Sequence, residues 1–412
     1  MVVGQSGNIK GQSCMEIQKE IKESYNEMVQ LRRWFHQHPE LGFQEEETSQ
    51  YIKDYLRKCD LRVITIAKTG VVGLLRGTSD GPTLLLRADM DALPIQEKNV
   101  IPYCSLYDGR MHACGHDGHM SILLVVAKIL SRFKERIKGN IKFAFQPSEE
   151  NGGGALKMIN EGVLEDPPVN ACMGLHLWSF LPTGAIGIES GPIMAGREHL
   201  VLTIKGKGGH TAAPHEAIDP IICTANIIQS LQQIQTRELN PDQKLILMFG
   251  KIQGGTAANV IPEKVELEGT IRYLFEDDSM NIDDVKQRIE KIIRSLCDAY
   301  KTDYTLEYKY SFPQLINNES LTDFIISVVE KCNIHSQKLN IVPLFTMASE
   351  DFAEFAIRVP SCFFFVGANN GKKETSYPHH HPNFNFDEKS LMIGTEVYIR
   401  CILEYFKTYN KK

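Results

Sequence analysis

The sequence lacks the features that mark several special classes of protein. No apolar run approaches the roughly 20 residues that a membrane-spanning helix needs, and there is no internal repeat or low-complexity segment. The ten cysteines run from Cys14 to Cys401 without a CxxC pair, which excludes a disulfide mini-protein and predicts reduced thiols in an intracellular protein. The first residues show no basic stretch followed by an apolar one, so we expect no signal peptide and a cytoplasmic location.

The chain also lacks a block of positive charge. Its 45 Lys and Arg residues stand against 51 Asp and Glu residues, a net charge of −6, and no basic cluster follows the pattern of a phosphate-binding surface. We therefore expect neither a nucleic acid nor a membrane as partner. The 412 residues, 42% of them apolar, suffice for a well-buried core in two or three domains.

Short apolar runs alternate with helical patterns in the first half of the chain. Apolar residues at helical spacing predict two opening helices, over residues 17–35 and 51–56, separated by a Pro/Gly break. This alternation then predicts an open, mostly parallel α/β sheet. The expected strands are Val71–Leu75, Leu84–Leu86, Ile141–Phe145 and Ala171–Leu175. The expected helices between them are Ser121–Phe133 and Ala155–Glu161.

A different order of elements begins near Gly196. Strand, helix, strand, strand, helix and strand follow one another as in a ferredoxin-like domain, at Glu198–Lys205, Pro220–Ile234, Leu245–Ile252, Lys264–Phe275, Asp283–Tyr300 and Thr302–Tyr310. After Phe312, apolar helix and strand patterns resume at Leu321–Val329 and Cys362–Val366. We therefore expect a discontinuous α/β domain, residues 15–195 and 312–412, that carries an inserted α+β domain, residues 196–311.

Polar side chains follow three of the predicted strands at the point where each strand ends. Asp89 and Asp91 follow one strand, Glu149 and Glu150 another, and His176 a third. Ligands of open α/β sheets bind outside the carboxyl ends of the strands. We therefore expect these side chains to lie close together and to form a site.

A loop and the C-terminal region offer further donors. Cys114 and His116 lie two residues apart in a Gly-containing loop, and His379–His381 are consecutive. Cys, His and carboxylate groups are the usual protein ligands of divalent cations such as zinc. Five or more donors exceed what one tetrahedral zinc ion takes, so we expect two cations, with Glu149 left free as a general base.

Each of these residues also has an ordinary structural interpretation. Loop histidines are usually solvated, a Glu-Glu pair commonly begins a helix, and Asp89 and Asp91 can cap a turn before Pro94. A chain that folds for stability alone has no reason to collect all of them at successive strand ends. Their combination therefore favours a site.

The sequence resembles the M20 metallopeptidase family, in particular its amidohydrolase branch of auxin-conjugate hydrolases, hippurate hydrolases and related N-acyl-amino-acid amidohydrolases. Where many M20 peptidases have H-x-D, this chain has Ala88-Asp89-Met90-Asp91, as the amidohydrolase branch does. The matching motifs, in order over roughly residues 31–390, are RRWFHQHPELGFQEEET, ADMDALPIQE, MHACGHDGHM, FQPSEENGGGA, GLHLW, KGKGGHTAAPHEAIDPI, GGTAANVIPEKVELEGTIR, SEDFAEF and HPNFNFDE.

The resemblance implies a fold, partners and site residues. The fold is a zinc-exopeptidase-like catalytic domain with a ferredoxin-like lid and dimerisation domain. Each subunit holds two divalent cations, Zn²⁺ or Mn²⁺, with Co²⁺ or Ni²⁺ as further candidates. The implied residues are the metal ligands Cys114, His116, Glu150, His176 and, from an H-x-P-x-F pattern, His380; the general base Glu149; and the substrate-holding His210, Asn259 and Arg272. Of the other histidines, His112 and His119 are expected to orient ligands.

We therefore expect a metal-dependent amidohydrolase that splits N-acyl amino acids, of the acetyl, benzoyl or indole-acetyl type, into a carboxylic acid and a free amino acid. We also expect a homodimer formed through the inserted domain. A dipeptidase or carboxypeptidase on the same scaffold is the nearest alternative. A catalytically silent metal-binding scaffold is a second alternative, and the presence of Glu149 beside a complete ligand set disfavours it.

Overall fold

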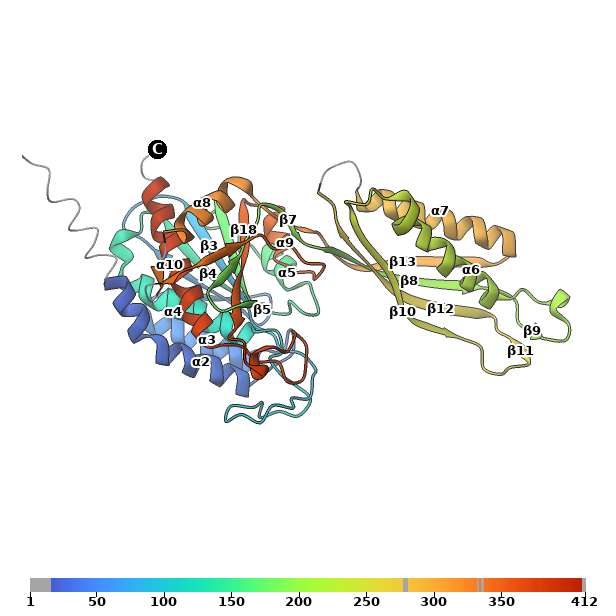
Figure 1. Cartoon of the computed structure of the whole chain (residues 1–412), viewed down its shortest axis with the longest axis horizontal. Helices are drawn as coiled ribbons and strands as arrows, with labels where there is room; N and C mark the ends of the chain where they lie inside the picture. Colours follow the sequence, from blue (N-terminus) through green and yellow to red (C-terminus); the bar gives the residue numbers. More distant parts are fainter. Residues whose placement is uncertain (1–15, 277–280, 332, 335–336, 410–412) are drawn as a thin grey trace, which may run out of the picture. The chain divides into compact units, whose positions relative to one another are not determined.

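The computed structural model describes residues 16–276, 281–331, 333–334 and 337–409. The chain divides into two compact units, each with its own sheet and hydrophobic core (Figure 1). Unit 1 takes in the described residues up to Gly191, Ile316–Leu344 and the residues from Glu354 on, and unit 2 takes in Pro192–Leu315 and Phe345–Ala353.

Unit 1 is built on one large sheet. Within the described residues, eight strands pair in the order β1-β2-β4-β3-β5-β18-β6-β17. The central strands β4, β3, β5 and β18 run parallel to one another. Towards one edge, β2 pairs antiparallel with β4, and β1 pairs antiparallel with β2. The strands are β1 (Arg62–Ile66), β2 (Gly70–Arg76), β3 (Thr83–Asp89), β4 (Asn140–Gln146), β5 (Ala171–Pro182), β6 (Ala185–Gly187), β17 (Asn340–Val342) and β18 (Ser361–Asn369).

The central strands are continuous apolar runs because side chains on both of their faces are buried. Leu84, Leu85 and Leu86 of β3 are all fully buried. Leu84 lies opposite Ile141 of β4 and Ala171 of β5, which sets the register of the parallel strands. The predicted mostly parallel sheet is thereby confirmed, and its strands extend past the expected ends, β5 by seven residues.

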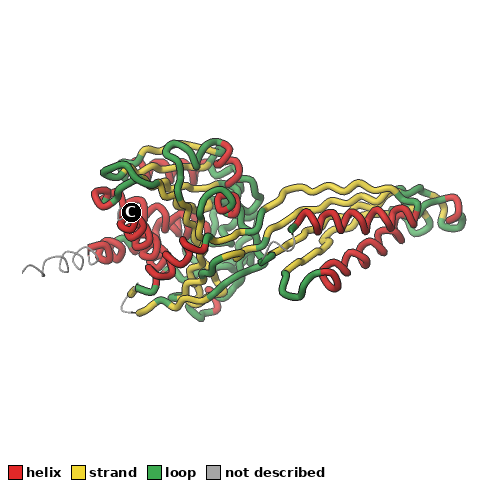
Figure 2. Tube along the Cα trace, turned by 90° about the horizontal axis from the view of Figure 1, so that it is seen from above, coloured by secondary structure: helices red, strands yellow, loops and turns green. Residues whose placement is uncertain are grey.

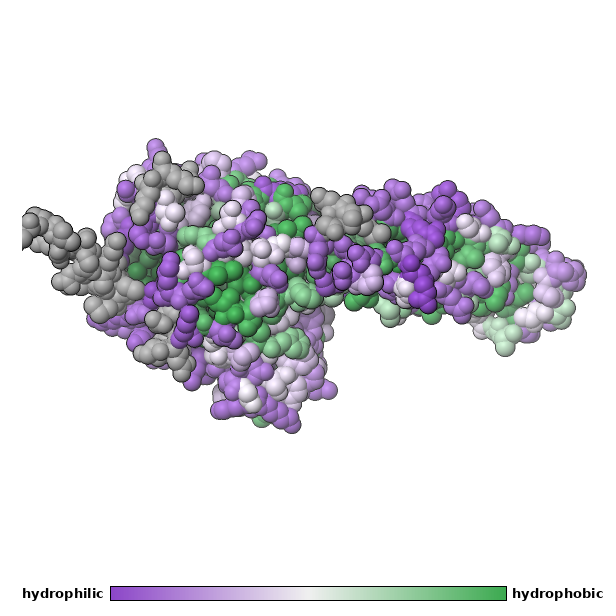
Figure 3. Space-filling model, turned by 45° about the horizontal axis from the view of Figure 1, so that its top comes forward, coloured by the Kyte–Doolittle hydropathy of each residue, from purple (hydrophilic) through white to green (hydrophobic). Residues whose placement is uncertain are grey.

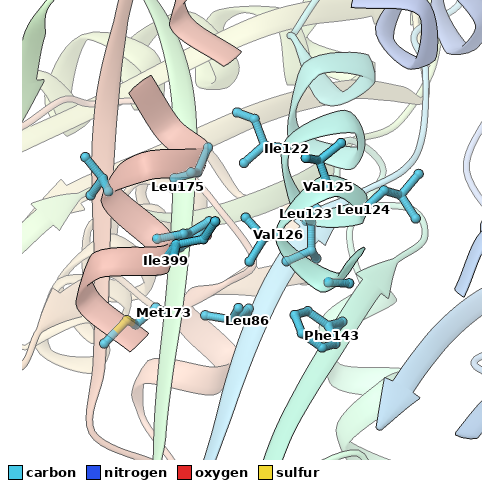
Figure 4. Packing of buried hydrophobic residues seen from close by; sticks show 14 of the residues in the cluster. Leu86, Ile122, Leu123, Leu124, Val125, Val126, Phe143, Met173, Leu175 and Ile399 are labelled. Carbon is cyan, nitrogen blue, oxygen red and sulfur yellow. The ribbon is translucent and has the colours of Figure 1, made fainter. Parts of the chain in front are cut away.

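Helix α4 lies at the centre of this core. It contacts β3 and β5 and packs against α2 and α10, and Figure 4 shows its side chains Ile122–Val126 among those of the strands and of Ile399 of α10. The helices are α2 (Tyr25–Gln37), α3 (Glu46–Lys58), α4 (His116–Arg132), α5 (Gly154–Asn160), α8 (Glu319–Val329), α9 (Ala353–Ala356) and α10 (Lys389–Tyr409), with the short η1 (Lys134–Arg136) and η4 (Lys373–Thr375).

The parallel register brings the carboxyl ends of β3, β4 and β5 to one edge of the sheet. β3 ends at Asp89 and β4 ends at Gln146, just before Glu149 and Glu150. The last partner of β5 on β3 is Gly174, opposite Arg87, and the same register places His176 level with Asp89 at the end of β3. The polar residues that follow the strands in the sequence therefore meet at this edge.

Unit 2 has the β-α-β-β-α-β order predicted for residues 196–311. Its four long strands pair antiparallel in the order β10-β12-β8-β13, and Figure 2 shows its two helices side by side along the sheet. The elements are β8 (Gly196–Lys205), β9 (Gly209–His210), η2 (Pro214–Glu216), α6 (Pro220–Gln233), η3 (Ile234–Glu238), β10 (Lys244–Gly254), β11 (Val260–Ile261), β12 (Lys264–Leu274), α7 (Ile282–Tyr300) and β13 (Asp303–Phe312).

The strands of unit 2 alternate buried and exposed residues because the helices cover one face of the sheet. Val265 and Leu267 of β12 belong to the core, whereas Ile246 and Met248 of the edge strand β10 are 39% and 57% exposed. Most of the surface visible in Figure 3 is hydrophilic, with apolar patches on each unit. Among the described residues, no helix combines the length and apolarity that crossing a membrane requires.

Candidate metal centre

Five donors expected from the sequence meet at the carboxyl edge of the sheet of unit 1. Sγ of Cys114 lies 3.5 Å from Nε2 of His176. Oε1 of Glu150 lies 3.1 Å from Nε2 of His380 and 3.9 Å from Nε2 of His116. Two groups, Cys114 with Glu150 and His380, and His116 with Glu149 and Glu150, each place their ligand atoms within 4.8 Å of one another.

The rings of His176 and His116 are oriented by the backbone. Nδ1 of His176 donates to the carbonyl oxygen of Leu177 at 2.7 Å, and Nδ1 of His116 donates to that of Asp91 at 2.8 Å. With the proton on Nδ1, each imidazole presents the lone pair of Nε2 to the cluster. This tautomer is the one that metal-binding histidines commonly adopt.

Two histidines of the C-terminal run reach the donors, His380 in a group with Cys114 and Glu150 and His379 in a group with Cys114 and His176. The backbone N–H of His380 donates to the carbonyl oxygen of Ala113 at 2.8 Å, which ties it to the loop of Cys114, and the φ of His380, 65°, lies in the left-handed region. A non-glycine residue held in that region is a local strain that the surrounding contacts must maintain.

One ring nitrogen of each neighbour of His380 accepts a backbone N–H. Nε2 of His379 accepts the backbone N–H of Ser179 at 3.2 Å, so its proton lies on Nδ1. Nδ1 of His381 accepts the backbone N–H of Asn383 at 3.0 Å. Nδ1 of His379 has no hydrogen-bond partner among the described residues, and the assignment of the ligand to His380 stays a prediction from the sequence pattern.

The cluster fits a cation. Oε1 of Glu150 is buried and accepts no hydrogen bond from the described residues, although Nε2 of His380 lies 3.1 Å away. Burial, followed by the charges of Glu150 and Glu149, raises the pKa of the Cys114 thiol well above its usual value. Buried lone pairs and negative charges that face one another are costly unless a positive charge lies among them.

Glu45 fixes the turn at Ser148 that leads into the loop of Glu149 and Glu150. Oε1 of Glu45 accepts the backbone N–H of Ser148 at 2.9 Å, and its Oε2 accepts the hydroxyl of Thr69 at 2.6 Å. Burial raises the pKa of Glu45 to about 7. The backbone of Ser148 is left-handed, with φ of 50°, at the turn that leads into Glu149.

Asp89 and His119 connect the ends of β3 and β5 through the start of α4. Asp89 accepts hydrogen bonds from Nδ1 of His119 at 2.6 Å and from Arg87 at 2.7 Å. Nε2 of His119 accepts the backbone N–H of Leu177 at 2.9 Å. Although burial raises the pKa of Asp89, His116 and His119 lower it well below its usual value.

His119 thus holds the residue next to His176, as expected for a histidine that orients ligands. His112 differs from this expectation. It is buried, and neither of its ring nitrogens makes a hydrogen bond within the part of the chain that the structure describes. Burial lowers its pKa to about 3, so the imidazole is neutral at physiological pH.

A buried ion network that we did not predict supports the start of α4. Nε of Arg32 donates to Oδ2 of Asp117 at 3.0 Å, and Nδ1 of His36 lies 2.8 Å from the same oxygen. Asp117 follows His116 directly and accepts the N–H of Gly118 at 3.0 Å. The signal for this network was present in the motifs RRWFHQHPE and CGHDGH, but the pairing of two segments this far apart in the sequence is not a local property.

In unit 2, His210 and Asn259 line one pocket. β9 and β11 pair with His210 opposite Val260, and the N–H of Thr211 donates to the carbonyl oxygen of Asn259 at 3.3 Å. Nδ1 of His210 accepts the N–H of Ala212 at 3.0 Å, so the proton lies on Nε2. His210 therefore presents a hydrogen-bond donor.

Arg272 lies elsewhere in unit 2. Its Nη1 donates to the carbonyl oxygen of Met347 at 2.9 Å and to Oγ of Ser349 at 3.0 Å, and no carboxylate of the described residues acts on its charge. On β12, Arg272 lies opposite Arg197, whereas Lys264, near the segment of His210, lies opposite Lys205. The strand between Lys264 and Arg272 spans roughly 25 Å, so unit 2 does not bring Arg272 and His210 together.

The fold and the donor cluster define an α/β protein with a candidate cation-binding centre at the carboxyl edge of its large sheet. Comparison with known families makes the assignment specific, because the model of the peptidase family M20/M25/M40 matches residues 85–404. The chain belongs to this family, which confirms the resemblance carried by the sequence motifs.

Relatives with named reactions and a solved relative cover most of the chain. The N-acetyl-L-cysteine deacetylase of Bacillus subtilis is 38% identical over 368 residues, which cover 89% of this chain and 85% of that protein. The IAA-amino acid hydrolase ILR1-like 4 of Arabidopsis thaliana is 38% identical over 384 residues, covering 92% and 85%. The crystal structure of the YXEP protein of Bacillus subtilis, described as a dinuclear metal binding peptidase from the M20 family, has a TM-score of 0.80 and 31% identity and covers 94% of this chain and 99% of that one.

Proposed function

We propose that this protein is a metal-dependent amidohydrolase that splits N-acyl amino acids into a carboxylic acid and a free amino acid. The observation that carries the proposal is the cluster of Cys114, His116, Glu150, His176 and His380, the first two and His176 buried and His380 exposed, with the buried Glu149 beside it. Two relatives that cover most of the chain are named for reactions of this kind, a deacetylase and an IAA-amino acid hydrolase.

The proposed ligands hold two divalent cations, Zn²⁺ or Mn²⁺, with Co²⁺ or Ni²⁺ as further candidates. The related YXEP protein is described as dinuclear, and the mixed sulfur, nitrogen and carboxylate donors suit these ions. Such cations polarise a carbonyl group and lower the pKa of water from 15.7 to about 7.

Glu149 is proposed as the general base. The backbone N–H of Glu149 donates to Asp91 at 3.0 Å. The side chain of Glu149 lies in one group with His116 and Glu150 and is not needed as a ligand. It takes a proton from the attacking water and delivers it to the departing amine nitrogen. General acid–base catalysis of this kind contributes typically about 10²–10⁴-fold to the rate.

Three residues of unit 2 are proposed to hold the substrate. The donor Nε2–H of His210 suits the oxyanion that forms at the carbonyl, and Asn259 lines the same pocket. Arg272 is partly buried, and burial lowers its pKa, so a substrate carboxylate would supply the negative charge that its surroundings lack.

The proposal includes a homodimer formed through residues 196–311. One N-acyl amino acid is far shorter than the roughly 25 Å of strand from Lys264 to Arg272, so His210 and Arg272 of a single chain cannot hold one substrate together. The edge strand β10, with Ile246 and Met248 exposed, offers an unpaired edge for a second copy. The cytoplasmic location stays part of the proposal. Among the described residues, no cysteine forms a disulfide, which suits a reducing compartment.

Amine release from a panel of N-acetyl, N-benzoyl and indole-acetyl amino acids tests the proposed function. The panel is run with added Mn²⁺ or Zn²⁺ and with a chelator, and we expect release that the chelator abolishes. No release from any conjugate by metal-loaded protein would contradict the proposal. Dipeptides with a free amine are the control, because their cleavage instead of the conjugates would support the dipeptidase or carboxypeptidase alternative, and cleavage of neither would support the silent scaffold.

A further inference from the structure

Arg272 is held within unit 2 by two neutral acceptors that bind the same nitrogen. Its Nη1 donates to the carbonyl oxygen of Met347 at 2.9 Å and to Oγ of Ser349 at 3.0 Å. A guanidinium group carries five N–H groups, and two of them are on Nη1. Nε and Nη2, which carry the other three, donate to no atom of the described residues. The two acceptors therefore leave one edge of the guanidinium group, formed by Nε and Nη2, open to a ligand.

No acid faces Arg272 from the neighbouring strands. On β12 it lies opposite Arg197 of β8 and Ile246 of β10. Burial alone lowers the pKa of Arg272, and no carboxylate of the described residues acts on it, although Glu350 and Asp351 come next in the segment that holds it. A carbonyl and a hydroxyl fix the guanidinium group without neutralising it, so its positive charge stays available to an anionic ligand.

The segment that carries Ser349 is fixed by the backbone of the same unit. The N–H of Thr346 donates to the carbonyl oxygen of Ile193 at 2.8 Å, and the N–H of Ala195 donates to that of Ala348 at 2.9 Å. The hydroxyl of Thr346 also accepts the N–H of Ala348 at 3.2 Å. These contacts hold the residues just before Ser349 against the residues that lead into β8, the strand that pairs with β12. The Ser349 hydroxyl is therefore in place before a ligand binds.

We propose that Ser349 is a positioning residue that turns the Nε–Nη2 edge of Arg272 towards the carboxylate of the substrate. This inference rests on the proposed amidohydrolase function. A carboxylate forms two parallel N–H···O bonds with such an edge, which fix the orientation of the amino-acid part as well as binding its charge. Without the hydroxyl, one N–H of Nη1 loses its acceptor and the side chain gains rotational freedom that binding must then remove. Ser349 thus contributes to the selection of substrates with a free carboxylate, and it acts through Arg272.

Two substrates that differ in the charge of the amino-acid part test this role. In metal-loaded protein we expect Ser349→Ala to raise KM for N-acetyl-L-alanine about fivefold, while KM for N-acetyl-L-alaninamide and both kcat values stay within about twofold. Ser349→Thr keeps the hydroxyl and should bring KM back to within about twofold of the parent chain. Ser327→Ala is the matched control in unit 1, where the hydroxyl of Ser327 donates to the carbonyl oxygen of Phe324 at 2.8 Å, and it should change none of these values.

A double-mutant cycle shows whether Ser349 acts through Arg272. In an Arg272→Ala background, Ser349→Ala should change KM for N-acetyl-L-alanine by less than about twofold, because the edge that the hydroxyl orients is gone. A further rise of about fivefold in that background would mean that Ser349 only supports the fold, and it would overturn the proposal.

A binding measurement separates this inference from the proposed reaction. Calorimetry with the metal-loaded Glu149→Gln chain, in which we expect no turnover, gives the Kd of the acid and of the amide. Ser349→Ala should raise the Kd of N-acetyl-L-alanine about fivefold and leave that of the amide unchanged. This pattern in a protein whose parent chain cleaves no conjugate would overturn the reaction and support the role of Ser349. Cleavage with an acid-to-amide ratio that ignores Ser349 would overturn the role and leave the reaction standing, and neither binding nor cleavage would overturn both.

Discussion

The carboxylate of Asp91 accepts the backbone N–H of Glu149 through Oδ1 at 3.0 Å. Its other oxygen accepts the N–H of Glu150, also at 3.0 Å, and its carbonyl oxygen accepts Nδ1–H of His116. Asp91 alone therefore fixes the proposed base, one carboxylate ligand and one imidazole ligand. Such supporting residues determine how well a metal site is pre-formed.

Asp91→Asn should weaken the metal centre without unfolding the chain. The amide keeps one acceptor but turns an NH₂ group towards a backbone N–H, so one of the two contacts becomes repulsive. We expect the affinity for Zn²⁺ or Mn²⁺ to fall about 10–100-fold, measured by competition with a fluorescent chelator. Asp80→Asn, at an exposed position, is the control, and an equal affinity in both variants would argue against this role of Asp91.

Glu149→Gln should retain the metal and lose turnover. Glutamine has nearly the same shape but cannot accept the proton of the attacking water. We expect kcat to fall by about 10²–10⁴-fold while the bound metal per chain, measured by atomic emission, stays the same. Glu135→Gln, on the exposed η1, should behave as the parent chain. Substantial activity of Glu149→Gln would remove Glu149 from the role of base.

Cys114→Ser should lower the amount of metal that survives dialysis. A serine hydroxyl is a much poorer ligand than a thiolate for zinc and similar ions. We expect a loss of at least one cation per chain at equilibrium. Cys104→Ser is the control, since the thiol of Cys104 donates to the carbonyl oxygens of Asn99 and Ile101 and a hydroxyl can do the same. Unchanged metal content of Cys114→Ser would exclude Cys114 as a ligand.

Arg272→Ala should discriminate between substrates with and without a carboxylate. Charge-assisted hydrogen bonds contribute about 1.5–3 kcal/mol, which corresponds to roughly a 10–150-fold rise in KM for N-acyl amino acids. KM for the corresponding amides should change little. Arg294→Ala, on the exposed side of α7, should affect neither class. Equal effects of Arg272→Ala on both classes would contradict the carboxylate contact.

Glu45 should make stability fall as the pH rises. Burial raises the pKa of Glu45 to about 7 in the folded chain, above the value of 4.5 for a free side chain. The folded state therefore binds the proton more tightly than the unfolded state. This contributes roughly 2–4 kcal/mol to the free energy of unfolding below about pH 4.5, and the contribution is lost by about pH 7.

Urea unfolding of the parent chain and of Glu45→Gln at pH 5 and pH 8 measures this effect. Glutamine imitates the protonated acid and can still accept from the N–H of Ser148. The variant should gain on the parent chain between the two pH values. A constant difference between the two proteins would show that Glu45 titrates normally.

The helices and strands that carry the core could be predicted from the sequence. Apolar runs such as Leu84–Leu86 and the alternation in β12 reflect burial on two faces or one, which is a local property of the chain. β1 was missed because its five residues include Arg62 and Thr65 and only Ile66 is buried. The strand ends in turn predicted where the donors gather, since parallel strands place their carboxyl ends together.

The supporting contacts of the site could not be predicted in the same way. Glu45 lies more than a hundred residues from Ser148, and Arg32 lies 85 residues from Asp117. These pairs follow from how α3 packs on β1 and β2 and how α2 packs on α4, and no periodicity reports that packing. The hydrogen bonds that Ser179 and Asn383 donate to His379 and His381 are likewise seen only in the folded chain, whereas the sequence pattern alone points to His380.

The proposed ligands come from widely separated segments of the chain, from Cys114 to His380. Cations bound by all of them would act as reversible cross-links that close a long loop and so reduce the conformational freedom of the unfolded chain. Removing them with a chelator should then shorten the lifetime of the fold itself, and proteolysis should begin in the segment around His380, whose left-handed backbone the ligation helps to hold.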